Sequence, residues 1–209
     1  MIYIYGDSHG VFSFKNLKLD NSNRSRFSIT MFRIGRDNTI VNLDKTTKFN
    51  MEDVIVLSYG EIDCRCHIQK QINLGRNEED VIDELVVNYF RTIRNDVINV
   101  KTVIVGVIPP KKIESTMLDD PSVEYPFVGT NEDRVRYTMK VNKKLEELAN
   151  SHNYIYFNPY SYYTRLDGTL KDELSDSNVH LGDNSYFLDQ FYKMWGFKYQ
   201  PPHHMGLIM

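Results

Sequence analysis

The sequence is poor in cysteine, because it contains only two, Cys64 and Cys66. A single residue separates them, which is too short a spacing for an ordinary structural disulfide, so we expect reduced thiols and a cytoplasmic setting. A closed metal site needs about four ligands, and the Cys-Arg-Cys-His run at 64–67 has no second ligand cluster to complete it. We therefore predict no metal and no cofactor.

Long apolar runs and excess charge are also missing. No apolar run approaches the ~20 residues that span a bilayer, and the N-terminus lacks the basic segment and apolar region of a signal peptide. The formal net charge of −3 gives no electrostatic case for nucleic acid or for an anionic membrane. The 209 residues suffice for one core, so we predict a single domain over 1–209, which could itself belong to a longer protein. The sequence gives no indication of oligomeric state.

Strand-like and helix-like segments alternate along the chain. Apolar and β-branched composition predicts strands at 2–5, 27–34, 53–60, 102–108 and 154–157. Helical spacing and capping residues predict helices at 11–17, 77–93 and 130–150, and the tail at 186–209 reads as a helix plus a coil. This alternation predicts a three-layer α/β/α sandwich around a five-stranded parallel sheet.

Several candidate residues directly follow predicted strands. They are Ser8, Gly35, Gly60 and the loop that begins at Pro109. Ligands of open α/β sheets bind beyond the carboxyl ends of the strands. The sequence therefore predicts a functional site at this edge of the sheet.

Two short polar stretches at opposite ends of the chain suggest a nucleophile and its base. The first is Gly6-Asp7-Ser8-His9-Gly10, where Ser8 either presents its hydroxyl in a cleft or, with Asp7, caps the following helix. The second is Ser175-Asp176-Ser177-Asn178-Val179-His180. An early serine with a late aspartate and histidine favours the nucleophile interpretation.

This order of parts resembles that of the SGNH (GDSL-type) hydrolases. Gly6-Asp7-Ser8 matches the first block of the family, with His9 in place of the usual leucine, and His180 matches the late histidine. The resemblance implies the SGNH-hydrolase-like sandwich with a flavodoxin-like strand order. It also implies that Ser8 is the nucleophile and His180 its base, with backbone N–H groups of Ser8 and Gly35 facing the oxyanion.

The aspartate of the proposed site departs from the family spacing. It usually lies three residues before the histidine, whereas Asp176 lies four before His180 and Ser177 lies three before it. An aspartate in this role orients the imidazole and stabilises its charged form. We expect Asp176 to serve, but the sequence leaves open whether Asp176 or Ser177 supports His180.

The third family block also departs from its pattern. The family reads Gly-x-Asn-Asp, with the asparagine as an oxyanion donor, whereas this chain reads Gly60-Glu61-Ile62-Asp63. Ile62 cannot donate a hydrogen bond from its side chain. Glu61 and Asp63 would repel an oxyanion unless they are paired, and Arg65 and His67 are close enough to pair with them.

This polar cluster leaves two further interpretations open. In a glycosyltransferase with a nucleotide-sugar donor, Glu61 or Asp63 would deprotonate a sugar hydroxyl while Arg65 or Arg36 holds a phosphate. A catalytically silent glycan-binding module would keep the cleft for recognition alone, and a structural ion-pair network would explain the same residues.

The leading hypothesis is an esterase that acts on a glycan or sugar ester. The sequence is rich in tyrosine, which offers sugars a flat apolar face and a hydroxyl, and Tyr163 is placed near the cleft. The catalytic candidates are Ser8, His180, Asp176, Glu61 and Asp63. The candidate substrate-binding residues are Asp7, His9, Gly35, Arg36, Gly60, Arg65, His67 and Tyr163.

Overall fold

The computed structural model describes residues 1–44, 46–114 and 124–196. Its centre is a five-stranded sheet in the order β2-β1-β3-β4-β5, with all neighbouring strands parallel. The strands are β1 (Ile2–Gly6), β2 (Asn21–Asn23), β3 (Val54–Ser58), β4 (Lys101–Val105) and β5 (Ile155–Phe157). This is the flavodoxin-like order, and it confirms the predicted parallel sheet.

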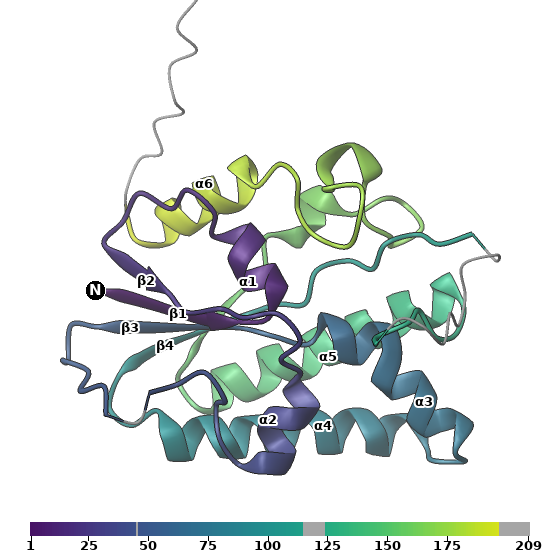
Figure 1. The fold of residues 1–209 in the computed structure, drawn as a ribbon, viewed down its shortest axis with the longest axis horizontal. Helices are drawn as coiled ribbons and strands as arrows, with labels where there is room; N and C mark the ends of the chain where they lie inside the picture. The colour runs from purple at the N-terminus through teal and green to yellow at the C-terminus, as the bar shows by residue number, and fades with distance from the viewer. Residues whose placement is uncertain (45, 115–123, 197–209) are drawn as a thin grey trace, which may run out of the picture.

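Helices cover both faces of the sheet. One layer holds α1 (Ser8–Ser13) and α6 (Ser185–Met194), and the opposite layer holds α2 (Met31–Asp37), α4 (Glu78–Asp96) and α5 (Asn131–Ser151) (Figure 1). The π-helix η1 (Asp63–His67) and α3 (Ile68–Asn73) follow β3, and short 3₁₀ helices lie at Tyr160–Tyr163 and Asp172–Leu174. The predicted three-layer sandwich is thus confirmed.

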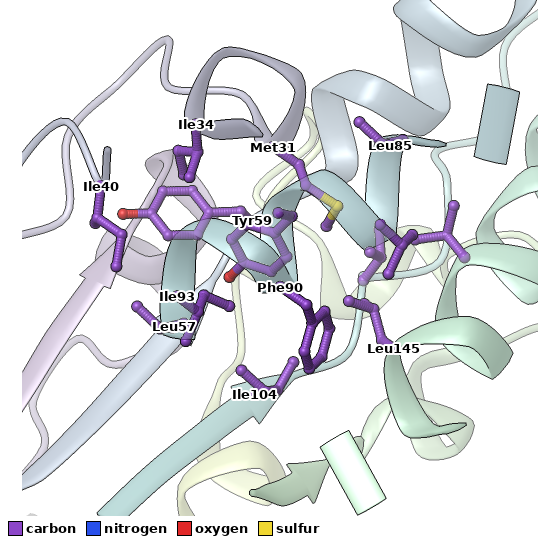
Figure 2. Close-up of a cluster of buried hydrophobic side chains, with 14 of the residues drawn as sticks. Met31, Ile34, Ile40, Leu57, Tyr59, Leu85, Phe90, Ile93, Ile104 and Leu145 are labelled. Atoms are coloured by element: carbon purple, nitrogen blue, oxygen red, sulfur yellow. The ribbon is translucent and has the colours of Figure 1, made fainter. Parts of the chain in front are cut away.

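Each central strand contributes side chains to two cores. In β3, Val54 and Val56 belong to the cluster beneath α6, while Ile55 and Leu57 belong to the cluster beneath α2 and α4. Successive side chains of a strand point to opposite faces, so a strand covered on both sides is apolar throughout. Figure 2 shows part of the second cluster, including Leu57 and Phe90.

The two long helices begin where their capping residues predict. The Asn77 side chain accepts hydrogen bonds from the N–H groups of Glu79 and Asp80 at the start of α4. Thr130 and Asp133 form a reciprocal capping box at the start of α5. These caps satisfy N–H groups that have no partner inside the helix, which fixes the first turn of each helix.

The prediction of a strand over 27–34 is wrong. Thr30 caps α2 by accepting a hydrogen bond from the Arg33 N–H, and the residues that follow form a helix. The carboxylate of Asp63 accepts hydrogen bonds from the N–H groups of Met31 and Phe32, at 2.7 and 3.2 Å. A contact with a residue more than thirty positions away therefore decides the local structure against its alternating pattern.

The strand that pairs with the outer side of β1 lies instead in a segment for which the sequence predicts no strand. β2 is the polar segment Asn21–Asn23, and its register pairs Ile2 with Asn21 and Ile4 with Asn23. It lies at the edge of the sheet, so main-chain pairing on one side suffices and no apolar pattern marks it.

Two further predictions concern the tail of the chain and the loop that begins at Pro109. α6 confirms the helix predicted in the tail, whereas residues 197–209, for which a coil is predicted, and residues 115–123 of the loop that begins at Pro109 lie outside the described residues. Among the helices of the described part, none is both long enough and apolar enough to cross a membrane.

Candidate active site

Ser8 is the first residue of α1, directly beyond the end of β1. Asp7 is the N-cap of this helix, and its carboxylate accepts a hydrogen bond of 2.8 Å from the His9 N–H. A Cβ at Gly6 would lie 2.7 Å from the Ser58 carbonyl oxygen, so only glycine fits this turn. Among the described hydrogen bonds, none uses the Ser8 N–H, which as a first-turn donor has no partner within α1.

His180 lies in the loop between the 3₁₀ helix at Asp172–Leu174 and α6. The Asp176 carboxylate accepts hydrogen bonds from the N–H groups of Asn178 and His180, at 2.8 and 3.1 Å. Ser177 adopts the left-handed conformation with φ of 67°, which accommodates the additional residue between Asp176 and His180. The His180 ring is also stacked on Phe12 of α1, with 4.1 Å between the ring centroids.

The structure brings Ser8, His180 and Asp176 into one hydrogen-bonded chain. The Ser8 Oγ lies 2.9 Å from His180 Nε2, and His180 Nδ1 lies 2.8 Å from Asp176 Oδ2. Because a carboxylate only accepts, Nδ1 carries a proton, and the neutral imidazole keeps Nε2 free to accept the serine proton. Asp176, and not Ser177, is therefore the side chain that orients His180.

The surroundings set the protonation of this chain. Burial and the charge of His9 lower the pKa of His180, against the opposing hydrogen bond and charge of Asp176. Burial would raise the pKa of Asp176, but hydrogen bonds from His180 and from backbone N–H groups lower it overall. Both directions favour a neutral imidazole beside an ionised carboxylate, the form in which His180 can act as a base.

Asp7 and His9 form a second buried pair next to the first. His9 Nδ1 lies 3.1 Å from Asp7 Oδ1, and His9 Nε2 lies 3.2 Å from the Val179 carbonyl oxygen. Burial alone would lower the pKa of His9, but the carboxylates of Asp7 and Glu61 raise it overall. His9, a candidate substrate-binding residue, is thus hydrogen-bonded within the protein and is closely tied to the loop that carries His180.

Glu61 is buried and paired with a cation. Its Oε1 accepts a hydrogen bond of 2.8 Å from Arg65 Nε, and its Oε2 lies 3.9 Å from His9 Nε2. Burial would raise the pKa of Glu61, whereas Arg65 and His9 lower it overall. Arg65 also donates to the Tyr125 carbonyl and lies over the Phe127 ring. The Glu61–Arg65 pair removes the repulsion that an unpaired carboxylate would create.

Asp63 has a structural role in the described contacts. It is fully buried, and besides binding the first turn of α2 it lies 3.1 Å from His67 Nδ1. With both carboxylate oxygens occupied, Asp63 is not free to act as a base toward a ligand. Gly60, just before it, has φ of 118°, and a Cβ there would lie 2.9 Å from both Met31 and Val107. Gly60 thus permits the sharp turn from β3 into η1.

Three predicted substrate-binding residues lie elsewhere. Gly35 is inside α2 rather than after a strand, and a Cβ there would lie 2.8 Å from Asn88 of α4. Its predicted place beside the oxyanion is therefore wrong. Gly35, Arg36 and His67 line a cavity of about 220 Å³ between α2, α3 and α4, which neither Ser8 nor His180 lines.

Tyr163 is not at the cleft either. It is fully buried in the core beneath α6, and its hydroxyl accepts a hydrogen bond of 2.9 Å from the Phe187 N–H. The prediction that it faces a substrate is wrong, because its ring packs in the core and its hydroxyl binds the backbone of α6.

Sequence reasoning missed two groups that contact the histidines. Phe12 lies one helical turn after Ser8, a spacing that places both on one side of α1, and this signal could have identified it. The Val179 backbone carbonyl faces His9, and the type of a residue gives no indication of such a backbone contact. Within the described residues, no group of three or more His, Cys, Asp or Glu side chains could hold a metal ion.

Solved structures of similar fold include bacterial proteins of the GDSL type. No protein-family model matches the chain, and no curated protein matches its sequence. A Streptococcus pneumonia protein assigned as a platelet activating factor is 18% identical, with a TM-score of 0.61 over 93% of this chain and 82% of that one. A GDSL-like lipase from Bacteroides thetaiotaomicron is 13% identical, with a TM-score of 0.54 over 93% of this chain and 86% of that one.

A third neighbour is a catalytic mutant of an acetylxylan esterase from Geobacillus stearothermophilus. It is 14% identical, and the alignment covers 94% of each chain with a TM-score of 0.58. At this level of identity the similarity concerns the architecture alone. The chain therefore has the fold of the SGNH (GDSL-type) hydrolases.

Proposed function

We propose that the protein is an esterase that removes an acyl group from a glycan or sugar ester. The observation that carries this proposal is the chain of hydrogen bonds from Ser8 through His180 to Asp176. The acetylxylan esterase among the neighbours supports an acylated carbohydrate as the substrate class. The buried, free thiols of Cys64 and Cys66 suit the predicted reducing, cytoplasmic setting.

The reaction would proceed by acyl transfer to Ser8. The Ser8 Oγ attacks the ester carbonyl while His180 Nε2 takes its proton, and His180 then gives this proton to the departing sugar oxygen, which leaves as a hydroxyl. Water, deprotonated by His180, attacks the acyl-serine, and the departing Ser8 oxygen recovers a proton from His180. Asp176 keeps the imidazole in the required tautomer and stabilises its charged form.

The oxyanion requires fixed hydrogen-bond donors, each worth about 2.7–4 kcal/mol when lost. The free backbone N–H of Ser8 is one such donor. Ile62 is nearly buried and offers none from its side chain, so the asparagine donor of the family pattern is missing here. We therefore expect slower acyl transfer than in an enzyme with the complete set.

The contacts of Glu61 and Asp63 weigh against the glycosyltransferase alternative. Asp63 binds the first turn of α2 with both carboxylate oxygens, and Glu61 is held in a buried ion pair with Arg65 through Oε1, so each carboxylate already has a structural partner. Arg36, one of the two proposed phosphate ligands, is exposed on α2 and paired with Asp37. The silent binding module remains an outcome of the test.

The test compares ester hydrolysis with nucleotide-sugar binding. The purified protein is assayed with p-nitrophenyl acetate and with acetylated xylo-oligosaccharides, and screened for thermal stabilisation by nucleotide-sugars. Ser8→Ala should abolish hydrolysis, whereas Ser151→Ala, at the exposed end of α5, should not. Stabilisation by a nucleotide-sugar without ester turnover would indicate the transferase. Glycan binding without turnover would indicate the silent module.

A further inference from the structure

Both ring nitrogens of His9 face groups that only accept hydrogen bonds. Nδ1 lies 3.1 Å from the Asp7 carboxylate, and Nε2 lies 3.2 Å from the Val179 carbonyl oxygen. A neutral imidazole has one protonated nitrogen and would present a lone pair to one of these oxygens. The two contacts are satisfied together only when both nitrogens carry protons, which makes His9 an imidazolium.

The balance of buried charge leads to the same result. Asp7 and Glu61 are two carboxylates with 0% and 4% exposure, and a buried charge is costly unless it is paired. Arg65 pairs with Glu61, at 2.8 Å, which leaves His9 as the cation that contacts Asp7. Glu61 Oε2, at 3.9 Å from His9 Nε2, adds a second negative charge on that side.

We propose that His9 is an imidazolium at neutral pH and acts as a positioning residue, anchoring the Val179–His180 segment and keeping His180 in its neutral, proton-accepting form. This inference rests on the proposed esterase function in its assignment of His180 as the base. It gives His9 a role that a leucine, the usual residue at this place in the family pattern, could not supply.

The anchoring follows from the contact with Val179. The His9 Nε2–H donates to the carbonyl of the residue that immediately precedes His180, so the backbone of the loop is fixed from the side of α1. Asp176 fixes the same loop from within through the His180 N–H. The two contacts hold the imidazole in place against Ser8 from opposite sides.

The effect on protonation follows from proximity. The rings of His9 and His180 lie 4.8 Å apart between centroids, so a charge on His9 opposes a second charge on His180. The other charges that face these rings are those of Asp7, Glu61, Asp176 and Arg65. The lowered pKa of His180 and the raised pKa of His9 agree with this arrangement. Asp176 remains the group that stabilises His180 when it carries the proton.

The test is an NMR titration of the histidine ring nitrogens, which requires no turnover. In the parent protein, both ring nitrogens of His9 should be protonated at pH 7. His180 Nε2 should remain unprotonated as the pH is lowered, down to values below the ordinary pKa of an imidazole. In His9→Gln, the midpoint of the His180 titration should rise by about one pH unit. The double variant Asp7→Asn/His9→Gln also removes the carboxylate that the single variant leaves unpaired. In this variant the midpoint of the His180 titration should rise by less than in His9→Gln.

The outcomes separate the two proposals. A neutral His9 in the parent protein, or an unchanged His180 midpoint in both variants, would overturn the inference. A merely structural role would lower the melting temperature of His9→Gln without moving that midpoint. If the titrations behave as expected but no ester is hydrolysed, the charge state of His9 stands and the esterase proposal fails.

Discussion

The Ser8 hydroxyl oxygen lies 2.9 Å from His180 Nε2, although 172 positions separate the two residues in sequence. The contact joins the end of the first strand to a loop just before the last described helix. Because the two groups lie far apart in the sequence, the site forms only when folding brings the first strand and this loop together. The following predictions probe the site and its supports.

Asp176 should matter for activity far more than Ser177. Asp176→Asn keeps the shape of the side chain but cannot hold the required tautomer of His180, so kcat should fall by about 10³–10⁴-fold. Ser177→Gly removes the other candidate side chain and accepts the left-handed backbone at this position, so it should retain near-parental kcat. Ester hydrolysis rates measure both, and the opposite ranking would assign the support to Ser177.

Activity should persist to mildly acidic pH. Burial and the charge of His9 lower the pKa of His180 from its ordinary 6.5, so the imidazole stays neutral and able to accept a proton below that value. We expect the acidic limb of kcat/KM against pH to have its midpoint below 6.5. A midpoint above this value in the pH–rate profile would contradict the assigned environment of His180.

Removal of the Asp63 carboxylate should destabilise the fold. Asp63→Ala deprives two N–H groups of α2 and the His67 ring of their acceptor, which should lower the free energy of unfolding by about 3 kcal/mol. Glu147→Ala, on the exposed side of α5, should change it by less than about 0.5 kcal/mol. Urea denaturation checks both. A stable, inactive Asp63→Asn variant would instead revive Asp63 as a catalytic base.

Two glycines with positive φ offer a matched test of packing. Gly60→Ala must adopt φ of 118° and place its methyl group 2.9 Å from Met31 and Val107, so we expect a loss of about 2–3 kcal/mol. Gly75→Ala has φ of 87° but no atom within 4 Å, so backbone strain alone should cost about 1 kcal/mol. Equal losses in thermal or urea unfolding would show that packing at Gly60 contributes little.

The sequence predicts the central sheet well because its inner strands are apolar on both faces. β3 is apolar except for its last residue and β4 is apolar in its last three residues, and α4 and α5 are marked by their caps and periodicity. The predicted strand over 27–34 is wrong because Asp63 binds the first N–H groups of a helix there. This contact is visible only in three dimensions. The sequence misses β2 because an edge strand of three polar residues carries no hydrophobic pattern.

The candidate site is predictable to the extent that short motifs define it. Ser8, His180 and Asp176 are all found from the sequence, and the structure brings their side chains together. Gly35 and Tyr163 are misplaced because their assignment depended on a wrong strand and on composition. The hydrogen bond between His9 and the Val179 carbonyl could not be foreseen, since it joins two segments that lie far apart in the sequence.

The backbone angle of Ser177 has a consequence for how such sites are recognised. Asp176 lies four residues before His180 and Ser177 between them is left-handed, yet the imidazole still reaches the serine. A fixed count between acid and base is therefore a poor criterion for this kind of loop. A residue that tolerates positive φ, such as glycine or asparagine, would serve equally well at this position, whereas a β-branched one would be expected to pull the carboxylate away.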